Sequence, residues 1–526
     1  MAYYKDLRGY LEALEKAGLL VRVKRKINKD TELHPLVRLQ FRGLPEEQRK
    51  TFLFESVVDG SGKKYKFPVT VSAISGSRRI YAMALKCEPE EIVAKWDNAQ
   101  SHPVKPVMVE SAQVYEEVHM GDNLLEHGGL DEFPVPISTP GFDVAPYLTA
   151  SYWITKDLET GIHNVGTYRA QLKSPTSTGI LMEYKEQHIA KHWEQCRKLG
   201  IPLQAAIAIG GSPNIGCVSV SKFPYEVDEF DVAGGLAGEP LELVKCKTVD
   251  LEVPANAEII IEGEVSTAEV EPEAPFGEYH GYMGLRGYRP FFTVKCIAHR
   301  KDAIFQSFIS QRGPNEDVRI PHMESGLYKL LRHDSNIPSV EKVVIQQSRM
   351  LVIQMTKPER GEVMRALEIA TQASPTIKIS VAVDADINPY DTDAIIWAIA
   401  SRAQPQRDMS IVGQRGIASD YSVEPPEETL ARDARLQSVP SGSALLIDAT
   451  LKWPYPPVSL PAKEYMERAL VLWEGEGLPK LTLKEPWWGY DLGHWSEEEK
   501  EQAMLAVKGQ YYKTGEILAR RRKRVD

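Results

Sequence analysis

The sequence has few cysteines and lacks the features of secreted, membrane-spanning or nucleic-acid-binding chains. Its 526 residues include 5 cysteines without a CxxC pair, which favours free thiols in a reducing compartment. No apolar run reaches the roughly 20 residues that span a bilayer, and acidic residues interrupt the N-terminal apolar stretches, so no signal peptide is expected. The net charge of −10 excludes the broad basic excess typical of nucleic-acid binding. We therefore predict a cytoplasmic protein with neither a nucleic acid nor a membrane as its partner.

Several nucleotide-binding and hydrolase motifs are also absent. The glycine-rich segment 208–216 follows a predicted strand but has neither the GxGxxG order nor the GKS/T ending of a P-loop, so a strand and turn are expected there. No Gly-x-Ser-x-Gly elbow occurs, which argues against a serine hydrolase of that type. The acidic residues between 384 and 393 lack the glycine and closing glutamate of an EF-hand and are interpreted as loop and helix-cap residues.

Hydrophobic patterning divides the chain into three predicted domains, residues 1–118, 119–325 and 326–526. The first mixes helices and strands, and Asp6 is placed to cap its first helix. The second is rich in β-branched and aromatic segments at short spacing, which is typical of a sandwich or barrel. Its predicted strands are 148–155, 204–209, 257–264 and 291–298.

The last domain alternates strand and helix, which favours an α/β layer. Residues 376–384 are predicted as a buried strand and 391–403 as a helix. Ser496 and Glu499 have capping-box spacing and predict a long helix that ends near Arg520. This helix is expected to dock on a neighbouring subunit or, equally, to pack on its own domain. Its apolar residues are Met504, Leu505, Val507, Tyr511, Tyr512 and Leu518.

The densest chemical pattern is the segment 271–284, EPEAPFGEYHGYMG, in which Glu273 and Glu278 flank a Pro-Phe-Gly turn. Two carboxylates held close together cannot both ionise cheaply, so one of them is expected to hold a proton near neutral pH, as a general acid must. The alternative is an acidic surface loop, because Glu269 and Glu271 extend the cluster.

Two further groups of residues could bind anions or metals. Arg169 lies among uncharged residues, where its guanidinium could clamp a substrate carboxylate or form a structural ion pair. Asn164, His188 and Glu229 offer an amide, an imidazole and a carboxylate, a set that suits Mn²⁺ or Mg²⁺ better than zinc. No short spacing links these three residues, and each could equally be an ordinary core or surface residue.

In this order, the fragments resemble the UbiD family of decarboxylases. The family's ExPFGE motif is present at 273–278. Its arginine follows a metal-binding asparagine by five residues, as Arg169 follows Asn164. The Gln187-His188 pair and Glu229, upstream of an LELVKC segment, also match, and the resemblance runs over most of the chain.

The resemblance implies an α/β protein with an N-terminal α/β domain, a central split β-barrel cofactor domain and a C-terminal α/β oligomerisation domain with a terminal helix. It implies prenylated FMN from a separate flavin prenyltransferase, Mn²⁺ (or Mg²⁺) on Asn164, His188 and Glu229, a nearby K⁺, and a homo-oligomer (dimer or hexamer). Thr149, Gln187 and Arg169 match cofactor-binding positions. The sequence departs from some relatives in lacking a phosphate-contacting lysine at 441–449.

The resemblance also implies the reaction, a reversible non-oxidative decarboxylation of an aromatic acid that releases CO₂. Arg169 would orient the carboxylate and Glu273, and Glu278 would protonate the carbon after CO₂ leaves. Four polar residues of the segment 308–325 are expected to line the substrate pocket, or equally to pack a loop. They are Gln311, Arg312, Arg319 and His322. Such polar groups favour a phenolic or heteroaromatic acid over a cinnamate, whose plain ring would leave them unpaired.

Three other functions remain open. The enzyme could work mainly as a carboxylase that fixes CO₂ on an arene, because one site serves both directions. It could be a catalytically silent flavin-binding subunit, although the intact set of Arg169, Glu273 and Glu278 argues against this. An ordinary flavin reductase would oxidise NAD(P)H, which a decarboxylase of this type does not.

Overall fold

The structure, a computed structural model, describes residues 2–182, 187–278, 281–309, 316–359, 361–415, 422 and 442–523. It forms two compact units. The first contains Met1–Leu330, Gln347–Arg349 and Arg415–Gly442, and the second contains the remaining segments. The boundaries of the three predicted domains stay predictions.

The N-terminal part of the first unit is a small sheet covered by helices. Its strand order is β1-β3-β5-β22. The predicted helix cap is confirmed, because the Asp6 side chain accepts a hydrogen bond from the Gly9 amide (2.9 Å) at the start of α1. The elements are α1 (Leu7–Lys16), β1 (Leu20–Val23), α2 (Leu33–Gly43), β3 (Thr51–Phe54), β5 (Val69–Val71), α3 (Arg78–Leu85), α4 (Ile92–Ser101) and β22 (Phe305–Ser307).

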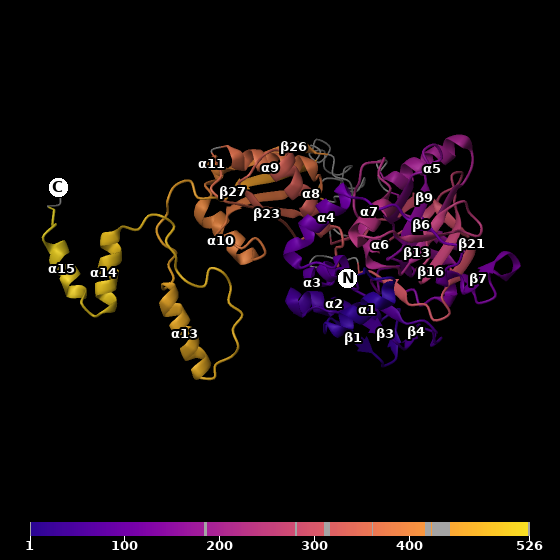
Figure 1. Ribbon diagram of the computed structural model, residues 1–526, viewed down its shortest axis with the longest axis horizontal. Coiled ribbons are helices and arrows are strands. Elements are labelled where there is room, and N and C mark those ends of the chain that lie inside the picture. The colour runs from indigo at the N-terminus through magenta and orange to yellow at the C-terminus, as the bar shows by residue number, and fades with distance from the viewer. Residues whose placement is uncertain are drawn as a thin grey trace, which may run out of the picture. The chain divides into compact units, whose positions relative to one another are not determined.

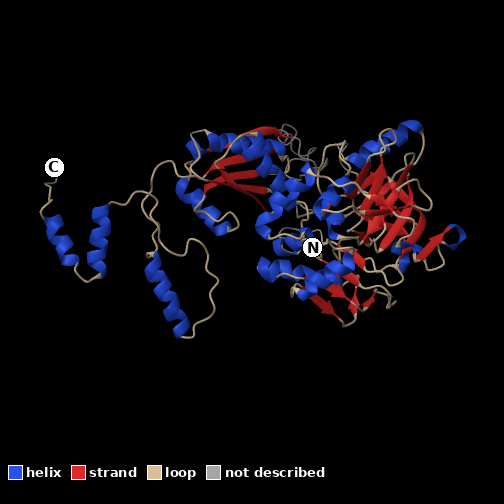
Figure 2. Cartoon of the chain, viewed as in Figure 1, coloured by secondary structure: helices blue, strands red, loops and turns tan. Residues whose placement is uncertain are grey.

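A curled antiparallel sheet of nine strands is the largest sheet of the first unit (Figures 1 and 2). Its order is β10-β9-β13-β16-β21-β12-β11-β8, and β7 pairs with β21 outside this path. The strands are β7 (Glu117–Met120), β8 (Tyr147–Leu148), β9 (Tyr152–Lys156), β10 (His163–Thr167), β11 (Ala170–Ser174), β12 (Ser177–Gly179), β13 (Leu203–Ile209), β16 (Ile259–Val265) and β21 (Phe291–His299). The predicted strands of the middle domain are confirmed, except that 148–155 is split between β8 and β9.

Both faces of this sheet are buried, which explains why its strands are apolar at successive positions. Side chains such as Ile154 and Ile260 belong to a core shared with α1, α3, α4 and α7 (Glu229–Ala237). Their neighbours, such as Trp153 and Ile261, belong to a second core that includes Ile189 of α5 (His188–Leu199). Two helices therefore begin beside the sheet, at His188 and at Glu229.

Short elements complete the first unit. The segment 208–216 begins as the predicted strand and turn, through Ser212, but from Pro213 onward it belongs to the short helix α6 (Pro213–Val218), which was not predicted. The remaining strands pair as β2 (Ile27–Asn28) with β4 (Val57–Val58), β14 (Glu242–Lys245) with β6 (Val107–Met108) and β15 (Glu252–Pro254), β17 (Glu271–Glu273) with β20 (Gly287–Arg289), and β18 (Phe276–Gly277) with β19 (Met283–Gly284). Helix α8 (Ile320–Lys329) ends the main segment. None of the five cysteines forms a disulfide.

The second unit contains a five-stranded sheet of order β23-β24-β25-β27-β26. Its strands are β23 (Val340–Gln346), β24 (Met350–Met355), β25 (Ile379–Asp384), β26 (Met409–Arg415) and β27 (Gly442–Asp448), and its helices include α9 (Glu362–Ala373), α10 (Thr392–Arg402) and α11 (Pro405–Asp408). Asp391 caps α10, while Asp384 and Asp386 bind Arg402, so these residues are the loop and cap acids that were expected.

The prediction of one long terminal helix that ends near Arg520 is wrong. Its capping box at Ser496 is present, but α14 (Glu497–Val507) stops before Gly509, whose φ is 72°, and α15 (Tyr511–Ala519) is a separate helix. A left-handed glycine ends a helix at little cost, so the local pattern is interrupted there. Neither these helices nor α13 (Lys463–Gly475) has a buried residue. Among the described residues, no helix has the length and apolar character needed to cross a membrane.

Candidate active site

The centre of the candidate site is Arg169, which lies between β10 and β11 and binds two glutamates. Its Nε and Nη2 atoms donate to the two carboxylate oxygens of Glu273 at 2.9 and 2.8 Å. Its Nη1 atom donates to Oε1 of Glu278. The Arg169 and Glu273 side chains are 9% and 1% exposed, whereas Glu278 is 17% exposed. The three residues therefore form one charged group that is open to solvent mainly at Glu278.

The turn between β17 and β18 brings the two glutamates to the same arginine. It passes through Ala274, whose φ of 80° is a conformation that few residues other than glycine adopt, and the peptide bond from Ala274 to Pro275 is cis. The Arg169 guanidinium lies over the Phe276 ring, with its Cζ atom 5.4 Å from the ring centroid. The Phe276 ring also packs against the Tyr147 ring, and the two ring centroids are 4.4 Å apart. An aromatic face attracts a cation, so the Phe276 ring helps to hold Arg169, and the Tyr147 ring supports the Phe276 ring.

Two glycines leave room for the charged group. A Cβ atom at Gly284 would lie 3.1 Å from Glu278 Oε1 and 3.3 Å from Arg169 Nη1. A Cβ atom at Gly179 would lie 3.1 Å from Cγ of Glu273. All three distances are tighter than ordinary van der Waals contact, so a side chain at either position would push a glutamate away from Arg169.

Asp143 is an acidic neighbour of Arg169 that the sequence did not identify. Burial raises its pKa to about 6, although the charges of Arg38 and Arg169 oppose the shift. Its Oδ2 atom accepts from the Thr139 amide at 2.6 Å, and its Oδ1 atom is buried without a hydrogen bond. Asp143 comes from the Pro/Gly-rich loop 134–146, and nothing in its local spacing links it to Arg169.

We expect Asp143→Asn to change how stability depends on pH. The folded state holds a proton on Asp143 up to about pH 6, whereas an unfolded aspartate loses it near pH 4, so this group's contribution to stability falls as pH rises between these values. Asparagine removes the effect, which solvent screening limits to about 1 kcal/mol. Urea unfolding of the flavin-free protein at pH 4.5 and pH 7.5 measures it. The exposed Asp250→Asn is the control, and equal changes in both variants would contradict the assignment.

Thr149 lies at the end of β8 in a buried chain of polar groups. Its hydroxyl accepts from the Phe308 amide at 2.8 Å and lies 2.9 Å from the Ser307 hydroxyl. The Ser307 hydroxyl in turn lies 3.0 Å from Nε2 of His34, whose pKa burial lowers to about 3. His34 is therefore a neutral hydrogen-bonding group, and Thr149 is fixed in position by the β22 strand.

The structure brings His188 and Glu229 together and places Asn164 nearby. His188 Nδ1 lies 3.4 Å from Glu229 Oε1, and Glu229 Oε2 accepts from the amide of Val165, which follows Asn164, at 3.2 Å. Burial raises the pKa of Glu229, and His188 partly offsets this shift. Gln187 directly precedes His188 at the start of α5. The role of these residues as metal or cofactor ligands stays a prediction.

The predicted substrate-pocket residues have varied surroundings. Arg319 forms an ion pair with Asp317 (2.7 Å), and its side chain is 35% exposed. His322 packs against Trp96 and Phe223 with ring centroids 4.5 and 5.3 Å away, and burial lowers its pKa to about 4. Gln311 and Arg312 lie outside the described residues. A role in binding substrate stays a prediction for all four.

Comparison with known proteins gives matches along most of the chain. Residues 106–313 match the family model described as the 3-octaprenyl-4-hydroxybenzoate carboxy-lyase Rift-related domain. Residues 322–449 and 11–99 match the C-terminal and N-terminal domains of the same carboxy-lyase. An uncharacterised protein of Archaeoglobus fulgidus is 31% identical, with 86% of this chain and 92% of that protein covered. Phenolic acid decarboxylase of Bacillus subtilis is 27% identical, with 78% and 87% covered.

Solved structures agree with the sequence matches. An evolved dimeric form of the UbiD-class enzyme HmfF from Pelotomaculum thermopropionicum, in complex with prFMN, has a TM-score of 0.74 at 30% identity and covers 87% of this chain and 97% of its own. The closed form of vanillic acid decarboxylase from Sedimentibacter hydroxybenzoicus has a TM-score of 0.72 at 26% identity, with 90% and 99% covered. These likenesses confirm the predicted α/β fold with a split-barrel centre.

Proposed function

We propose, from the premise that this chain belongs to the UbiD family of carboxy-lyases, that it releases CO₂ from an aromatic or heteroaromatic carboxylic acid with prenylated FMN as its cofactor. One observation carries the proposal: Arg169 is held by Glu273 and Glu278 in a nearly buried position. A guanidinium binds a substrate carboxylate with paired hydrogen bonds, and the adjacent, partly exposed Glu278 can deliver a proton.

The donor set beside β10 fits a divalent cation and a flavin phosphate. Glu229 is a buried carboxylate that faces the imidazole of His188, and a divalent cation would satisfy both groups. His188 and Glu229 are also the first residues of α5 and α7, and helix N-termini favour phosphate. Asn164, His188 and Glu229 would hold Mn²⁺ (or Mg²⁺), with K⁺ nearby, while Thr149, Gln187 and Arg169 would line the flavin.

The protein residues have separate tasks in the proposed reaction. Arg169 would hold the substrate carboxylate, and Glu273 would keep the guanidinium in place through its two hydrogen bonds. Glu278 would donate a proton to the carbon that loses CO₂. Prenylated FMN, when bound, would supply the electron sink that this chemistry requires. The Phe276 and Tyr147 rings would limit the access of water to the carboxylate.

A phenolic or heteroaromatic acid is the proposed substrate class. Two relatives are a phenolic acid decarboxylase and a vanillic acid decarboxylase, and the polar residues of the segment 308–325 suit a ring with a second polar group. The reaction would be reversible, and a carboxylase working mainly towards CO₂ fixation is the second candidate, because the same residues serve both directions.

Co-expression with a flavin prenyltransferase tests the proposal. We expect the purified protein to contain prenylated FMN by mass and Mn²⁺ by elemental analysis, and to release CO₂ from phenolic or heteroaromatic acids. Incubation of the products with bicarbonate measures the reverse direction. Plain FMN or no flavin despite the partner enzyme would overturn the proposal in favour of the silent subunit, and NAD(P)H oxidation would favour the reductase.

We also propose a homo-oligomer, a dimer or hexamer. The terminal helices α13, α14 and α15 expose apolar side chains, including Val471, Leu472, Val507 and Leu518. Such a surface is typical of a subunit interface, and the HmfF structure is described as a dimeric form. Light scattering of the full chain measures the state, and a monomer at micromolar concentration would contradict the proposal.

A further inference from the structure

Three histidines and two glutamates converge in the first unit where β7 lies on β21. Glu126 and His127 follow β7, and Glu132 is the last residue of the short helix η5 (Gly129–Glu132). His119 on β7 is opposite Ile297 in the antiparallel register, so His299, two residues further along β21, shares its face of the sheet. No local pattern in the sequence singles out these five residues.

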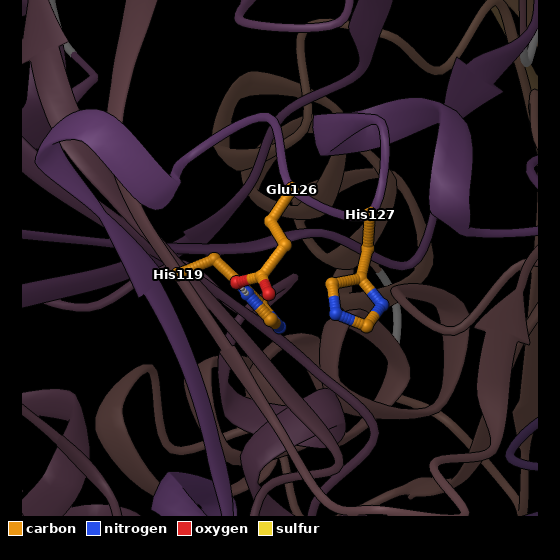
Figure 3. Close-up of side chains that lie close together, drawn as sticks. All are labelled: His119, Glu126 and His127. Carbon is orange, nitrogen blue, oxygen red and sulfur yellow. Dashed lines mark ion pairs between the residues drawn. The ribbon is translucent and has the colours of Figure 1, made fainter.

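The side chains form two overlapping groups, each close enough to hold one ion, and His119 belongs to both. The ligand atoms of His119, Glu132 and His299 lie within 4.8 Å of one another, as do those of His119, Glu126 and His127 (Figure 3). The closest nitrogen–oxygen distances are 3.6 Å from His299 to Glu132, 3.7 Å from His127 to Glu132 and 3.9 Å from His119 to Glu126. Two ligands about 2.1 Å from a tetrahedral zinc lie about 3.4 Å apart, so small side-chain movements would complete the geometry.

The two buried histidines have ring nitrogens aimed into the cluster without hydrogen bonds. His119 is 5% exposed, and neither of its nitrogens has a hydrogen-bond partner. His299 is 1% exposed and donates its Nδ1 hydrogen to the Arg300 carbonyl at 2.9 Å, while its Nε2 atom faces Glu132 without a hydrogen bond. A histidine oriented through one nitrogen by a backbone carbonyl, with the other nitrogen left available, is the usual arrangement of a metal ligand.

We propose that this cluster binds a divalent transition-metal ion of the zinc class, with the buried His119 and His299 and the partly buried Glu132 as three ligands and His127 as the fourth from the solvent side. Three imidazoles and one carboxylate suit zinc, and a site with four protein ligands is structural. The ion would tie the segment between residues 121 and 132 to the edge of the sheet. Phe67 and Phe133, whose rings contact His299 at 5.3 and 5.5 Å, form an apolar wall behind it.

The test is zinc binding by the full chain after removal of metals with a chelator. We expect calorimetric titration with zinc chloride to show that Glu132→Gln and His119→Asn each bind one zinc fewer per chain than the wild type, and zinc to raise the melting temperature of the wild type more than that of either variant. His102→Ala, which removes an exposed histidine after α4, should bind as many zinc ions as the wild type. Counting ions relative to the wild type separates this site from the proposed flavin site.

The exposed His127 keeps the test usable if a buried variant fails to fold. His127→Ala removes a side chain that is 50% exposed, so we expect it to fold and to weaken zinc binding at this site at least ~10-fold. Wild-type zinc stoichiometry and affinity in both Glu132→Gln and His127→Ala would overturn the proposal. A protonated His299 paired with Glu132 would then explain the cluster without a metal.

Discussion

Glu278→Gln is expected to remove nearly all turnover and to leave the flavin bound. Glutamine keeps nearly the same volume and can still contact Arg169, but it has no proton to give to the carbon that loses CO₂. The loss of a general acid typically costs 10²–10⁴-fold in rate, so we expect kcat to fall by roughly 10³-fold. Release of CO₂ and the flavin content per chain are the two measurements. By microscopic reversibility, the variant should also lose exchange of the product's ring hydrogen with D₂O.

Glu271→Gln is the matched control for this variant. Glu271 lies in the same acidic segment, is 40% exposed and pairs with Lys173 outside the Arg169 group. Exposed ion pairs contribute little to stability, so this variant should retain its rate. If Glu278→Gln turned over at a near-normal rate with full flavin content, Glu278 would not be the proton donor.

His188→Ala should lower the metal and flavin contents together. The substitution removes an imidazole from the proposed metal site and leaves Glu229 buried without the group that offsets its raised pKa. Changes around a metal site typically cost 10–100-fold in affinity, and loss of a direct ligand should cost at least as much. Elemental analysis for Mn²⁺ and flavin absorbance per chain measure the two losses, and activity should fall with flavin content.

Glu194→Ala provides the comparison on the same helix. Glu194 forms an exposed ion pair with Arg197 on α5, so its removal should leave both contents unchanged. A His188→Ala protein that retained normal Mn²⁺ and flavin would disprove the metal assignment. Loss of flavin with retention of the metal would instead indicate that His188 contacts the cofactor alone.

Local sequence signals predicted the elements that depend on neighbouring residues. The Asp6 cap, the strands from Leu203 to Ile209 and from Ile259 to Val265, and the Ser496 capping box are all present. The terminal helix was mispredicted because its apolar spacing continues past Gly509, although the glycine itself was the available signal for a break.

Contacts between distant segments were beyond local patterns. Arg169 and Glu273 are 104 residues apart in the sequence. Only the family resemblance predicted that they belong to one site. The family resemblance did not include Asp143, and its raised pKa comes from burial, which exists only in the folded chain. The cluster around His119 was missed for the same reason: strand register, rather than spacing along the chain, brings His299 to it.

The way Arg169 shares its hydrogens makes substrate binding an exchange of anions. A guanidinium has five N–H groups, and here Glu273 uses two nitrogens while Glu278 uses one. An arriving carboxylate that binds Nη1 would compete with Glu278, which contacts the guanidinium through one nitrogen rather than two. A half-buried carboxylate that has lost its cation takes up a proton more readily. Substrate binding would thus release Glu278 from the guanidinium before its proposed proton transfer to the carbon that loses CO₂.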